Sequence, residues 1–311
     1  MNARPVILDT DWYTDVDDAM AVRALINFQK QGVFRILGLC INARFEESVR
    51  SLDAFLLAHG VDVPIGIVQE WHDDSAPNGP SYQKRLAAMK SKYADNRAAE
   101  IPARLYRRLL ASSPDKVTLI SIGFTENYAA LLESAPDEIS PLSGRELVAQ
   151  KVEELWMMAG TWTKDGGQEY NLAGAGGTNP LITQSSSKVL SLWPTPITFL
   201  GFEIGYMLLS GGKLPKDDIL WQAMDDYNTQ GYRLANPEQH SHHSWDPLTI
   251  VMAGLGSPEK AGFFEIRGLA STDPSSGKNH FRQDPDGPHR FVVKKHFDSF
   301  YSDLIDEWLK S

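Results

Sequence analysis

Short apolar runs alternate with segments of helical spacing along most of this chain. Residues 6–8, 34–41 and 63–67 are apolar runs with the length of buried strands. Between them, residues 19–26 and 46–58 carry apolar side chains every three or four positions, as one face of a helix does. Alternation of this kind predicts a parallel sheet with right-handed crossover connections.

The same alternation continues through the rest of the chain. We expect further strands at residues 117–122, 155–158, 197–202, 263–269 and 291–295. We expect helices over residues 82–96, 180–189, 217–232 and 297–310, and others that begin near 102, 203 and 245. The pattern predicts an open, mostly parallel α/β sheet with helices on both faces. Because no repeat or obvious linker interrupts it, we expect one domain over residues 1–311.

Two connections are candidates for a functional role. Residues 70–81 are rich in turn formers and could form a lid over the carboxyl edge of the sheet. Residues 159–177 are rich in glycine, lack a clear period and are long for a connection between elements. Each follows a predicted strand, and open α/β sheets bind ligands beyond the carboxyl ends of their strands.

Composition narrows the class of partner. Hydrophobic residues make up 42% of the chain and charged residues 23%, as in ordinary globular proteins. The net charge is -10 and no basic run is present, which argues against a nucleic-acid or anionic-membrane partner. We therefore expect a small-molecule ligand, and the sequence leaves open whether the protein is a homo-oligomer.

Cysteine content and the N-terminal residues bear on the cellular compartment. The one cysteine, Cys40, lies inside an apolar run, so an intrachain disulfide and a multi-cysteine metal site are both excluded. Residues 1–5 lack the apolar region of a signal peptide, and no apolar segment reaches the roughly 20 residues needed to cross a bilayer. We expect a cytoplasmic protein.

The turn after the first predicted strand is crowded with acid. Two carboxylates about 4 Å apart in a protein repel each other by roughly 4 kcal/mol. Other interactions must therefore offset the repulsion within this turn. Thr14 or Asp15 could cap the following helix, whose dipole favours acids in its first turn. The cluster places five carboxylates within ten residues: Asp9, Asp11, Asp15, Asp17 and Asp18.

Helix capping leaves Asp11 unexplained. A carboxylate at the carboxyl end of a buried strand points into the crevice where open α/β sheets bind ligands. Carboxylate oxygens are also the ligands that hard cations prefer. We therefore expect a Ca²⁺ or Mg²⁺ site formed by Asp11 together with Asp17 or Asp18.

Five short motifs stand in order along the chain. The first is Asp9-Thr10-Asp11 followed by Asp17-Asp18-Ala19, and the others are Gly123 to Asn127, Met158-Ala159-Gly160, Glu169-Tyr170-Asn171 and Asp246-Pro247-Leu248. In order and spacing they resemble the DTD…DDA, G-P-L-T-N, M-G-G, E-F-N and D-P-L motifs of the inosine-uridine-preferring nucleoside hydrolases. The resemblance covers most of the chain.

The resemblance implies an open α/β fold with a Ca²⁺ ion at the bottom of a ribose pocket. The implied metal ligands are Asp11, Asp18, the carbonyl of Thr125 and Asp246. The side chains implied to contact the ribose are Asp17, Asn42, Glu169 and Asn171 at its hydroxyls and Met158 against the sugar. Asp11 would also take the proton from a calcium-bound water that attacks the anomeric carbon. The implied activity is calcium-dependent hydrolysis of the N-glycosidic bond of a ribonucleoside or related ribosyl compound, which gives ribose and free base.

General chemistry agrees with this activity. Glycosidic hydrolysis passes through a cationic, oxocarbenium-like sugar, which neighbouring carboxylates stabilise. Water bound to a metal is more acidic than bulk water, so Asp11 could deprotonate it without a large pKa shift of its own. A ligand set of aspartates and a carbonyl favours a hard ion such as Ca²⁺.

The chain departs from the family near the base. Purine-accepting members carry a histidine directly before D-P-L that protonates the leaving base, and Trp245 stands there instead. We expect Trp245 to contact the substrate. A proton donor contributes about 10²- to 10⁴-fold, so its loss would slow bases that leave poorly as anions. His242 and His243 lie just upstream and could supply the proton.

Other tryptophans could also surround the pocket. Trp12 lies in a segment that replaces the usual Pro-Gly after the first motif. Together with Trp162 and Trp245 it could place three indoles around the pocket, with one stacked on the base or sugar. The H-G motif of some relatives is absent, and Trp71-His72 is the nearest equivalent. The identity of the base stays open.

Two other functions also stay open. A strand that ends in D-x-D is the nucleophile motif of haloacid-dehalogenase-like phosphohydrolases, although Tyr13 stands where that family has Thr or Val. A catalytically weak or inactive ribosyl-binding protein would keep the metal and ribose pocket and lack the proton donor. The presence of Asp11 as a base favours the enzyme.

Overall fold

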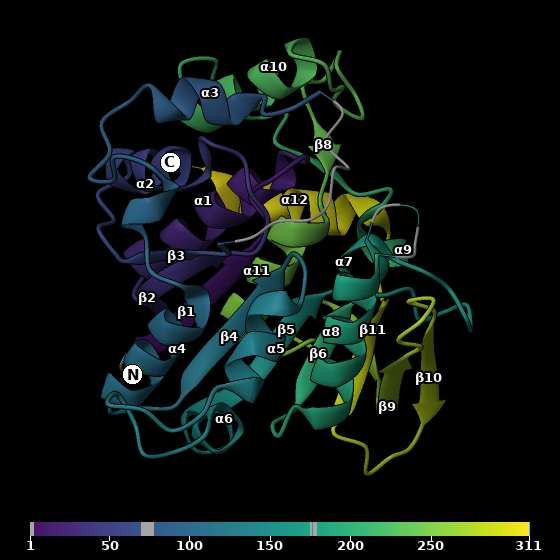
Figure 1. Ribbon diagram of the computed structural model, residues 1–311. Coiled ribbons are helices and arrows are strands. Elements are labelled where there is room, and N and C mark those ends of the chain that lie inside the picture. The colour runs from purple at the N-terminus through teal and green to yellow at the C-terminus, as the bar shows by residue number, and fades with distance from the viewer. Residues whose placement is uncertain (1–2, 70–77, 175, 177–178, 311) are drawn as a thin grey trace.

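The strands predicted from the apolar runs lie in one sheet. The computed structural model describes residues 3–69, 78–174, 176 and 179–310. Within them, nine strands form a sheet of order β10-β9-β11-β6-β5-β4-β1-β2-β3 (Figure 1). Strands β1 to β6 and β11 are parallel, whereas β9 and β10 form an antiparallel edge. Their bounds are β1 Arg4–Thr10, β2 Phe34–Ile41, β3 Ile65–Ile67, β4 Val117–Ile122, β5 Val152–Met158, β6 Ile197–Leu200, β9 Phe263–Thr272, β10 Asn279–Gln283 and β11 His289–Lys294.

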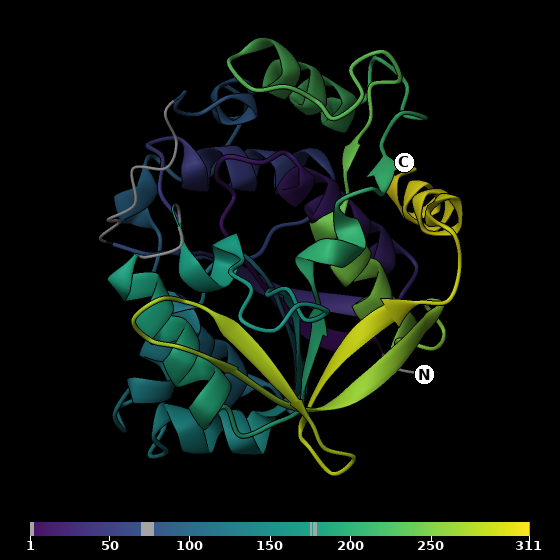
Figure 2. The ribbon, with the colours of Figure 1, turned by 90° about the vertical axis from the view of Figure 1, so that its right-hand side faces the viewer.

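Alternate residues of β1 pack in two separate hydrophobic cores, because successive side chains of a strand point to opposite faces of the sheet. Val6 and Leu8 pack in the core with helices α1 (Asp17–Lys30), α2 (Ser48–Ala58), α11 (Trp245–Leu255) and α12 (Asp298–Leu309). Ile7 packs in the core with helices α4 (Pro102–Ser112), α5 (Glu126–Glu133), α6 (Gly144–Lys151) and α8 (Pro180–Leu192). Figures 1 and 2 show these helical layers on opposite sides of the sheet, which confirms the predicted architecture.

Several short elements lie beyond the carboxyl ends of the parallel strands. Helices α3 (Tyr82–Ala87) and α10 (Ile219–Thr229) lie side by side (Figure 1). Strands β7 (Leu209–Ser210) and β8 (His242–His243) form a two-stranded antiparallel ribbon. The single-turn helices α7 (Tyr170–Ala173) and α9 (Phe202–Gly205) complete this group. Short elements therefore surround the edge at which open α/β sheets bind ligands.

The helix predicted over residues 82–96 is wrong in length. Helix α3 ends at Ala87, and a 3-10 turn (Asn96–Ala98) follows later. The segment between them is held in an irregular path by distant partners. The Asp53 carboxylate of α2 accepts hydrogen bonds from the Lys92 N–H and the Ser91 hydroxyl, both at 2.7 Å. These contacts replace the backbone hydrogen bonds that a longer helix would have made.

Other differences concern short elements. The helix expected near residue 203 is the single turn α9, and the sequence prediction missed α5, α6 and β10. The start of α6 could have been predicted from the sequence, because Ser143 and Glu146 have the spacing of a capping box and form one in the structure. Residues 70–77, which include most of the predicted lid and Trp71-His72, lie outside the described residues.

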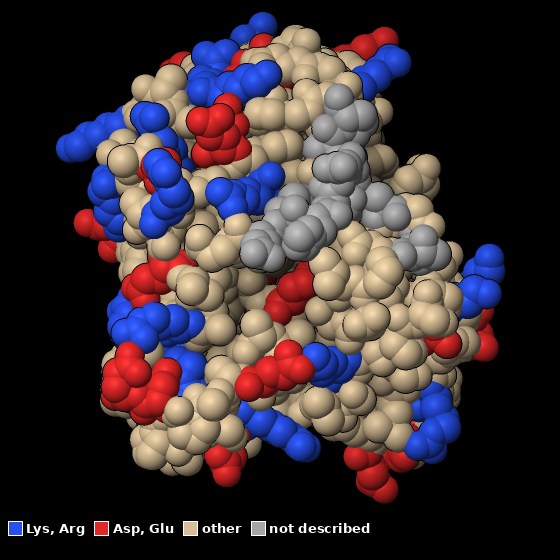
Figure 3. Space-filling view, viewed as in Figure 1, with Lys and Arg blue, Asp and Glu red and all other residues tan. Residues whose placement is uncertain are grey.

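Burial and surface charge agree with the compositional analysis. Cys40 is fully buried in β2, as predicted for a strand residue. No helix among the described residues is both long and apolar enough to cross a membrane. On the face drawn in Figure 3, basic and acidic side chains are interspersed, without a continuous basic patch.

A buried ion pair joins three helices that are distant in sequence. The Arg23 guanidinium of α1 donates to both carboxylate oxygens of Asp218 at 2.9 and 2.6 Å, and to the Leu309 carbonyl of α12 at 3.2 Å. Asp218 also caps α10, because it accepts the Leu220 N–H at 2.7 Å. Both charged side chains are almost completely buried.

We expect Arg23→Met to lower the free energy of unfolding by about 3 to 5 kcal/mol, because it leaves the Asp218 carboxylate buried without its cation. Urea denaturation measures this change. The control is Arg104→Met, which breaks the exposed pair with Glu138 and should cost less than about 1 kcal/mol. Equal losses for the two variants would contradict the assignment of Arg23 as a structural clamp.

Candidate active site

A cavity of about 250 Å³ opens at the carboxyl edge of the sheet. It brings together residues from the turn after β1, the end of β5, α7 and the start of α11. Eight of the ten residues predicted for the site line it. The described lining residues are Asp11, Thr14, Asp15, Asp17, Asp18, Ile122, Met158, Glu169, Tyr170, Asn171, Phe202, Trp245 and Asp246.

Backbone and hydroxyl groups hold the acidic turn after β1 in place. The Asp18 carboxylate accepts hydrogen bonds from the Thr10 hydroxyl and from the Trp12 N–H, the latter at 3.2 Å. Trp12 has a φ of 44°, a left-handed conformation that is unusual for a bulky residue. Its indole N–H donates to the Ser51 hydroxyl at 2.8 Å, and its ring packs edge-on against Tyr82. Trp12 is therefore a fully buried anchor for the turn and does not line the cavity, contrary to the prediction.

The start of α1 differs from the predicted cap. The N-cap position is Val16, which makes no side-chain capping bond, so neither Thr14 nor Asp15 occupies it. Asp15 instead accepts the Val16 N–H at 2.6 Å from one residue upstream. Asp17 and Asp18 lie in the first turn of the helix, as predicted.

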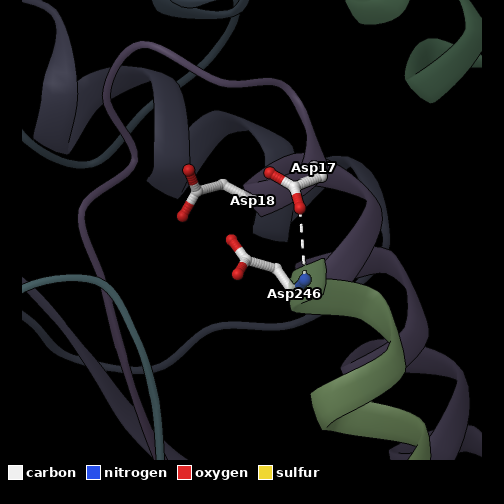
Figure 4. Close-up of side chains that lie close together, drawn as sticks. All are labelled: Asp17, Asp18 and Asp246. Carbon is white, nitrogen blue, oxygen red and sulfur yellow. Dashed lines mark hydrogen bonds between the residues drawn. The ribbon is translucent and has the colours of Figure 1, made fainter. Parts of the chain in front are cut away.

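Three buried carboxylates meet where α1 and α11 begin. Oxygens of Asp17, Asp18 and Asp246 lie within 4.8 Å of one another, and Asp17 accepts the Asp246 N–H at 3.1 Å (Figure 4). The resemblance had placed Asp17 on the ribose, yet its oxygen belongs to this group. Asp11 lies beside them, since its carboxyl shares a hydrogen bond with that of Asp18.

The pKa values of these four carboxyl groups are raised because the groups are buried close together. Burial, and then the charges of neighbouring aspartates, raise the pKa of Asp17, Asp18 and Asp246 well above the usual range. Burial also raises the pKa of Asp11 to about 7. Several closely spaced, buried oxygen ligands that resist ionisation fit a hard divalent cation, whose charge would offset their repulsion.

Asn42 and Thr125 do not line the cavity but lie directly behind its wall. The Asn42 amide donates to the Asp9 carboxylate and to the Phe124 carbonyl, and its oxygen accepts the Phe124 N–H at 3.0 Å. Both of its donor hydrogens are thus used within the protein, so it fixes the turn after β4. Thr125 is the N-cap residue of α5, and its carbonyl accepts the Ala129 N–H at 3.0 Å, which leaves a second lone pair for another ligand.

Gly123 permits this close approach of the turn to β1. A Cβ atom at this position would lie 2.5 Å from the Asp11 nitrogen and 2.7 Å from the Asn42 side-chain oxygen. Any larger residue would therefore displace the backbone at Asp11. The glycine of the second motif is therefore required because a side chain has no room there, and not because of an unusual backbone conformation.

Asp9 is structural in this protein. It is fully buried, and its carboxylate accepts hydrogen bonds from the Tyr106 hydroxyl at 2.6 Å and from Asn127 at 3.1 Å, in addition to Asn42. Burial raises its pKa to about 7. A carboxylate enclosed in this way cannot attack a substrate in the cavity. This geometry argues against the phosphohydrolase alternative, which needs the first aspartate of D-x-D as nucleophile.

Glu169, Asn171 and Met158 form one side of the cavity. The Glu169 oxygens accept the N–H groups of Asn171 and Gly160, both at 2.8 Å, and burial raises the pKa of Glu169 to about 7. Gly160 has a φ of 80°, and this turn directs its N–H toward Glu169. The Asn171 amide donates to the Met158 carbonyl at 2.9 Å and to its sulfur at 3.2 Å. Asn171 therefore offers a ligand its side-chain oxygen.

Aromatic residues also line the cavity. Trp245 stacks on Phe202 with ring centroids 5.3 Å apart, and its indole N–H donates to the Phe202 carbonyl at 2.8 Å. We refer to Phe202 and Trp245 as the aromatic wall. Trp162 is not part of it, because its indole N–H donates to the Ala159 carbonyl and its ring is buried against Phe199. One of the three predicted indoles therefore lines the cavity.

Asp15 lines the cavity, whereas the sequence analysis considered it only as a possible helix cap. His242 donates from Nε2 to the Asp15 carboxylate at 2.8 Å, because its Nδ1 already accepts the Ala235 N–H. Burial acts to raise the pKa of Asp15, but the interaction with His242 outweighs it and the pKa is lowered. Neither His242 nor His243 lines the cavity. The spacing of Asp15 within the acidic cluster was the available signal, whereas its pairing with His242 spans 227 residues.

Comparison with known proteins supports this assignment of the fold. The solved structure of a purine-preferring ribonucleoside hydrolase from Gardnerella vaginalis superposes with a TM-score of 0.71 at 15% identity, over 98% of both chains. The inosine-uridine preferring nucleoside hydrolase from Bacillus anthracis gives a TM-score of 0.64 at 17% identity, over 98% of this chain and 99% of that one. The chain therefore has the fold of the nucleoside hydrolases, as its motifs predicted.

One sequence relative points to the same group. The non-specific ribonucleoside hydrolase RihC of Escherichia coli is 29% identical over 140 residues. That match covers 43% of this chain and 44% of the relative, so it spans less than half the length of either protein. No family model matches the chain.

The crowding of carboxylates predicts a cation-dependent change of stability with pH. An acid whose pKa is raised on folding, as Asp11 is to about 7, contributes stability below about pH 4 that is lost as the pH rises through 7. Without metal, we expect the melting temperature to fall between about pH 5 and pH 8. Ca²⁺ should restore it at pH 8 and have little effect at pH 5, because ligands must be deprotonated to bind. Thermal unfolding with CaCl₂ or EDTA checks this, and the absence of a Ca²⁺ effect at pH 8 would refute it.

Removing the charge of one clustered aspartate should change the stability of the metal-free protein and cation binding in opposite directions. Asp18→Asn keeps an oxygen for the Thr10 and Trp12 hydrogen bonds and removes one charge. We expect it to raise the free energy of unfolding in EDTA, by up to about 4 kcal/mol, and to abolish the Ca²⁺-dependent increase. Asp165→Asn, which changes an exposed carboxylate outside the cavity, is the control and should do neither.

Proposed function

We propose that the protein is a calcium-dependent hydrolase that cleaves the N-glycosidic bond of a ribonucleoside or related ribosyl compound. The observation that carries the proposal is the composition of the cavity. Its lining combines the acid cluster, the polar side chains of Glu169 and Asn171, and several aromatic rings. These are the chemical features needed for a cation and water, a sugar, and a base, respectively.

Asp11 is the proposed general base. It lies at the carboxyl end of β1, is 8% exposed, and has a pKa raised to about 7, where a base is most effective near neutral pH. It would take the proton of the attacking water. Asp11, Asp18, Asp246 and the Thr125 carbonyl would hold the Ca²⁺ ion, with Asp17 close enough to take part. When bound, the ion supplies Lewis acidity that favours deprotonation of water.

The other lining residues would bind and stabilise the sugar. Glu169 and Asn171 would accept hydrogen bonds from ribose hydroxyls, and Met158 would pack against the sugar. Asp17 remains a second candidate for a hydroxyl contact. Asn42 would act indirectly, through the Phe124 backbone that it holds. As the bond breaks, positive charge develops on the ring, and the surrounding carboxylates would stabilise it.

The relatives support the same chemistry. The two solved structures compared above and the RihC relative are named as nucleoside or ribonucleoside hydrolases, and they share no more than 29% identity with this chain. A ribosyl-binding protein is the second candidate, because Trp245 occupies the position at which a proton donor was expected. Turnover distinguishes the two.

We expect Asp11→Ala to reduce release of ribose by about 10²- to 10⁴-fold, since the attacking water loses its base. Reducing-sugar assays on purine, pyrimidine and cationic ribosides, with Ca²⁺ and with EDTA, measure this. Asp165→Ala, an exposed acid outside the cavity, is the matched control and should retain full activity. Unchanged ribose release by Asp11→Ala would refute the proposed role. Ligand binding without turnover by the unmodified protein would favour the binding protein.

A further inference from the structure

The charge of the cavity restricts its ligands. Among the described lining residues there are six carboxyl groups and no Lys, Arg or His: Asp11, Asp15, Asp17, Asp18, Glu169 and Asp246. When these groups are ionised, as metal binding requires of its ligands, one divalent cation neutralises two of the charges. The remaining field favours cationic or neutral ligands and disfavours phosphorylated ones.

Trp245 and the histidines that precede it in the chain supply no proton donor to the cavity. Trp245 occupies the predicted position of the acid, and its N–H is used by the Phe202 carbonyl. The imidazole of His243 lies with its ring centroid 4.9 Å from that of Trp245 and stacks on Tyr206, but it does not line the cavity. The neighbouring His242 is occupied on both nitrogens, by Ala235 and by Asp15. Asp15 accepts hydrogen bonds from His242 and from the Val16 N–H, as an ionised carboxylate does. A base that must be protonated in order to leave therefore finds no donor among these groups.

The aromatic wall suits a positively charged ring. Phe202 is 41% exposed and stacks on Trp245 with an interplanar angle of 23°, so two aromatic rings that line the cavity are held together. Trp245 is held closely, because a Cβ atom on Gly205 would lie 2.3 Å from its ring. Aromatic faces attract cations through the ring quadrupole, and tryptophan does so most strongly. Tyr170, a further lining residue, adds a third aromatic ring.

From these three features we infer that the substrate is a ribosyl compound whose glycosidic nitrogen belongs to a positively charged aromatic ring. An N-ribosylated pyridinium and an N7-alkylated purine nucleoside both have this chemistry. The inference rests on the proposed function and specifies its substrate class.

The reaction of such a substrate needs no acid. The water oxygen forms a bond to the anomeric carbon, and one water proton passes to Asp11. The bond between carbon and nitrogen breaks, and its electron pair returns to the ring nitrogen, which becomes neutral. Ribose and an uncharged aromatic base are released. A neutral nucleoside would instead release its base as an anion, which the acidic cavity destabilises.

The test compares inosine with 7-methylinosine, which differ by one methyl group and the positive charge that it confers. Ribosyl nicotinamide serves as a pyridinium probe. We expect kcat/KM for 7-methylinosine to exceed that for inosine by at least about 100-fold, the usual contribution of a proton donor. A cationic base also leaves more readily without an enzyme, so variants of Trp245 are needed to assign the preference to this site.

Two variants separate the contributions of Trp245. Trp245→His introduces an imidazole, and we expect it to raise kcat for inosine below about pH 7 while leaving kcat for 7-methylinosine unimproved. Trp245→Leu removes the π face, and we expect it to raise KM for both cationic probes by roughly 2- to 30-fold, with a smaller effect on inosine. Phe297→Leu changes a 90% exposed aromatic residue outside the cavity and serves as control. Melting curves confirm that each variant is folded.

The outcomes are distinct. Equal kcat/KM for inosine and 7-methylinosine, or an unchanged ratio in Trp245→His, would overturn the inference and leave the proposed hydrolase activity standing. No ribose release from any of the three probes, with Ca²⁺ binding retained in calorimetry, would overturn the proposed function itself. Preference for 7-methylinosine that falls in Trp245→His and a raised KM for the cations in Trp245→Leu would support the inference.

Discussion

Electrostatic repulsion among buried carboxylates is the constraint on which this site depends. Asp17 and Asp18 are placed together by the first turn of α1, and Asp246 joins them from the first turn of α11. Two helix N-termini converge there, and their dipoles favour negative charge. The hydroxyl of Thr10 and the N–H of Trp12 add donors to the same group. These contacts offset only part of the repulsion, as the raised pKa values of the three acids indicate.

The sheet protects this arrangement from relaxation. β1 lies inside the sheet between β4 and β2, so the residue that follows it cannot move without disturbing both neighbours. Behind it, Asp9 and Asn42 fix the turn after β4, and Gly123 allows that turn to lie against Asp11. An acid cluster in a loop would separate to relieve its repulsion. Here the rigid elements hold the acids together, so a bound cation would relieve their electrostatic repulsion and bind more tightly as a result.

Sequence patterns predicted the strands and the motif residues well, because both depend on local regularities. β2 and β4 have the predicted bounds, and Asp11, Asp246 and Glu169 lie in one cavity as their motifs implied. The predictions that were wrong concern residues whose positions depend on contacts with distant parts of the chain. Asp53 binds Ser91, 38 residues away, in the segment where a longer α3 was predicted. Trp12 is buried in the core because its indole N–H donates to Ser51 and its ring packs against Tyr82. The pairing of Asp15 with His242 likewise depends on a ribbon that local periodicity cannot place.

The hydrogen bond from the Asp246 N–H to Asp17 has a consequence for how the protein folds. Its two partners are 229 residues apart, so closing this contact costs much chain entropy, and we expect it to form late in folding. The acid cluster is then a product of folding and is absent from the early stages. A bound cation would accordingly slow unfolding and leave the folding rate nearly unchanged, since it has no assembled site to bind in the transition state. The repulsion that the cation offsets therefore arises late, when the rest of the fold is already able to withstand it.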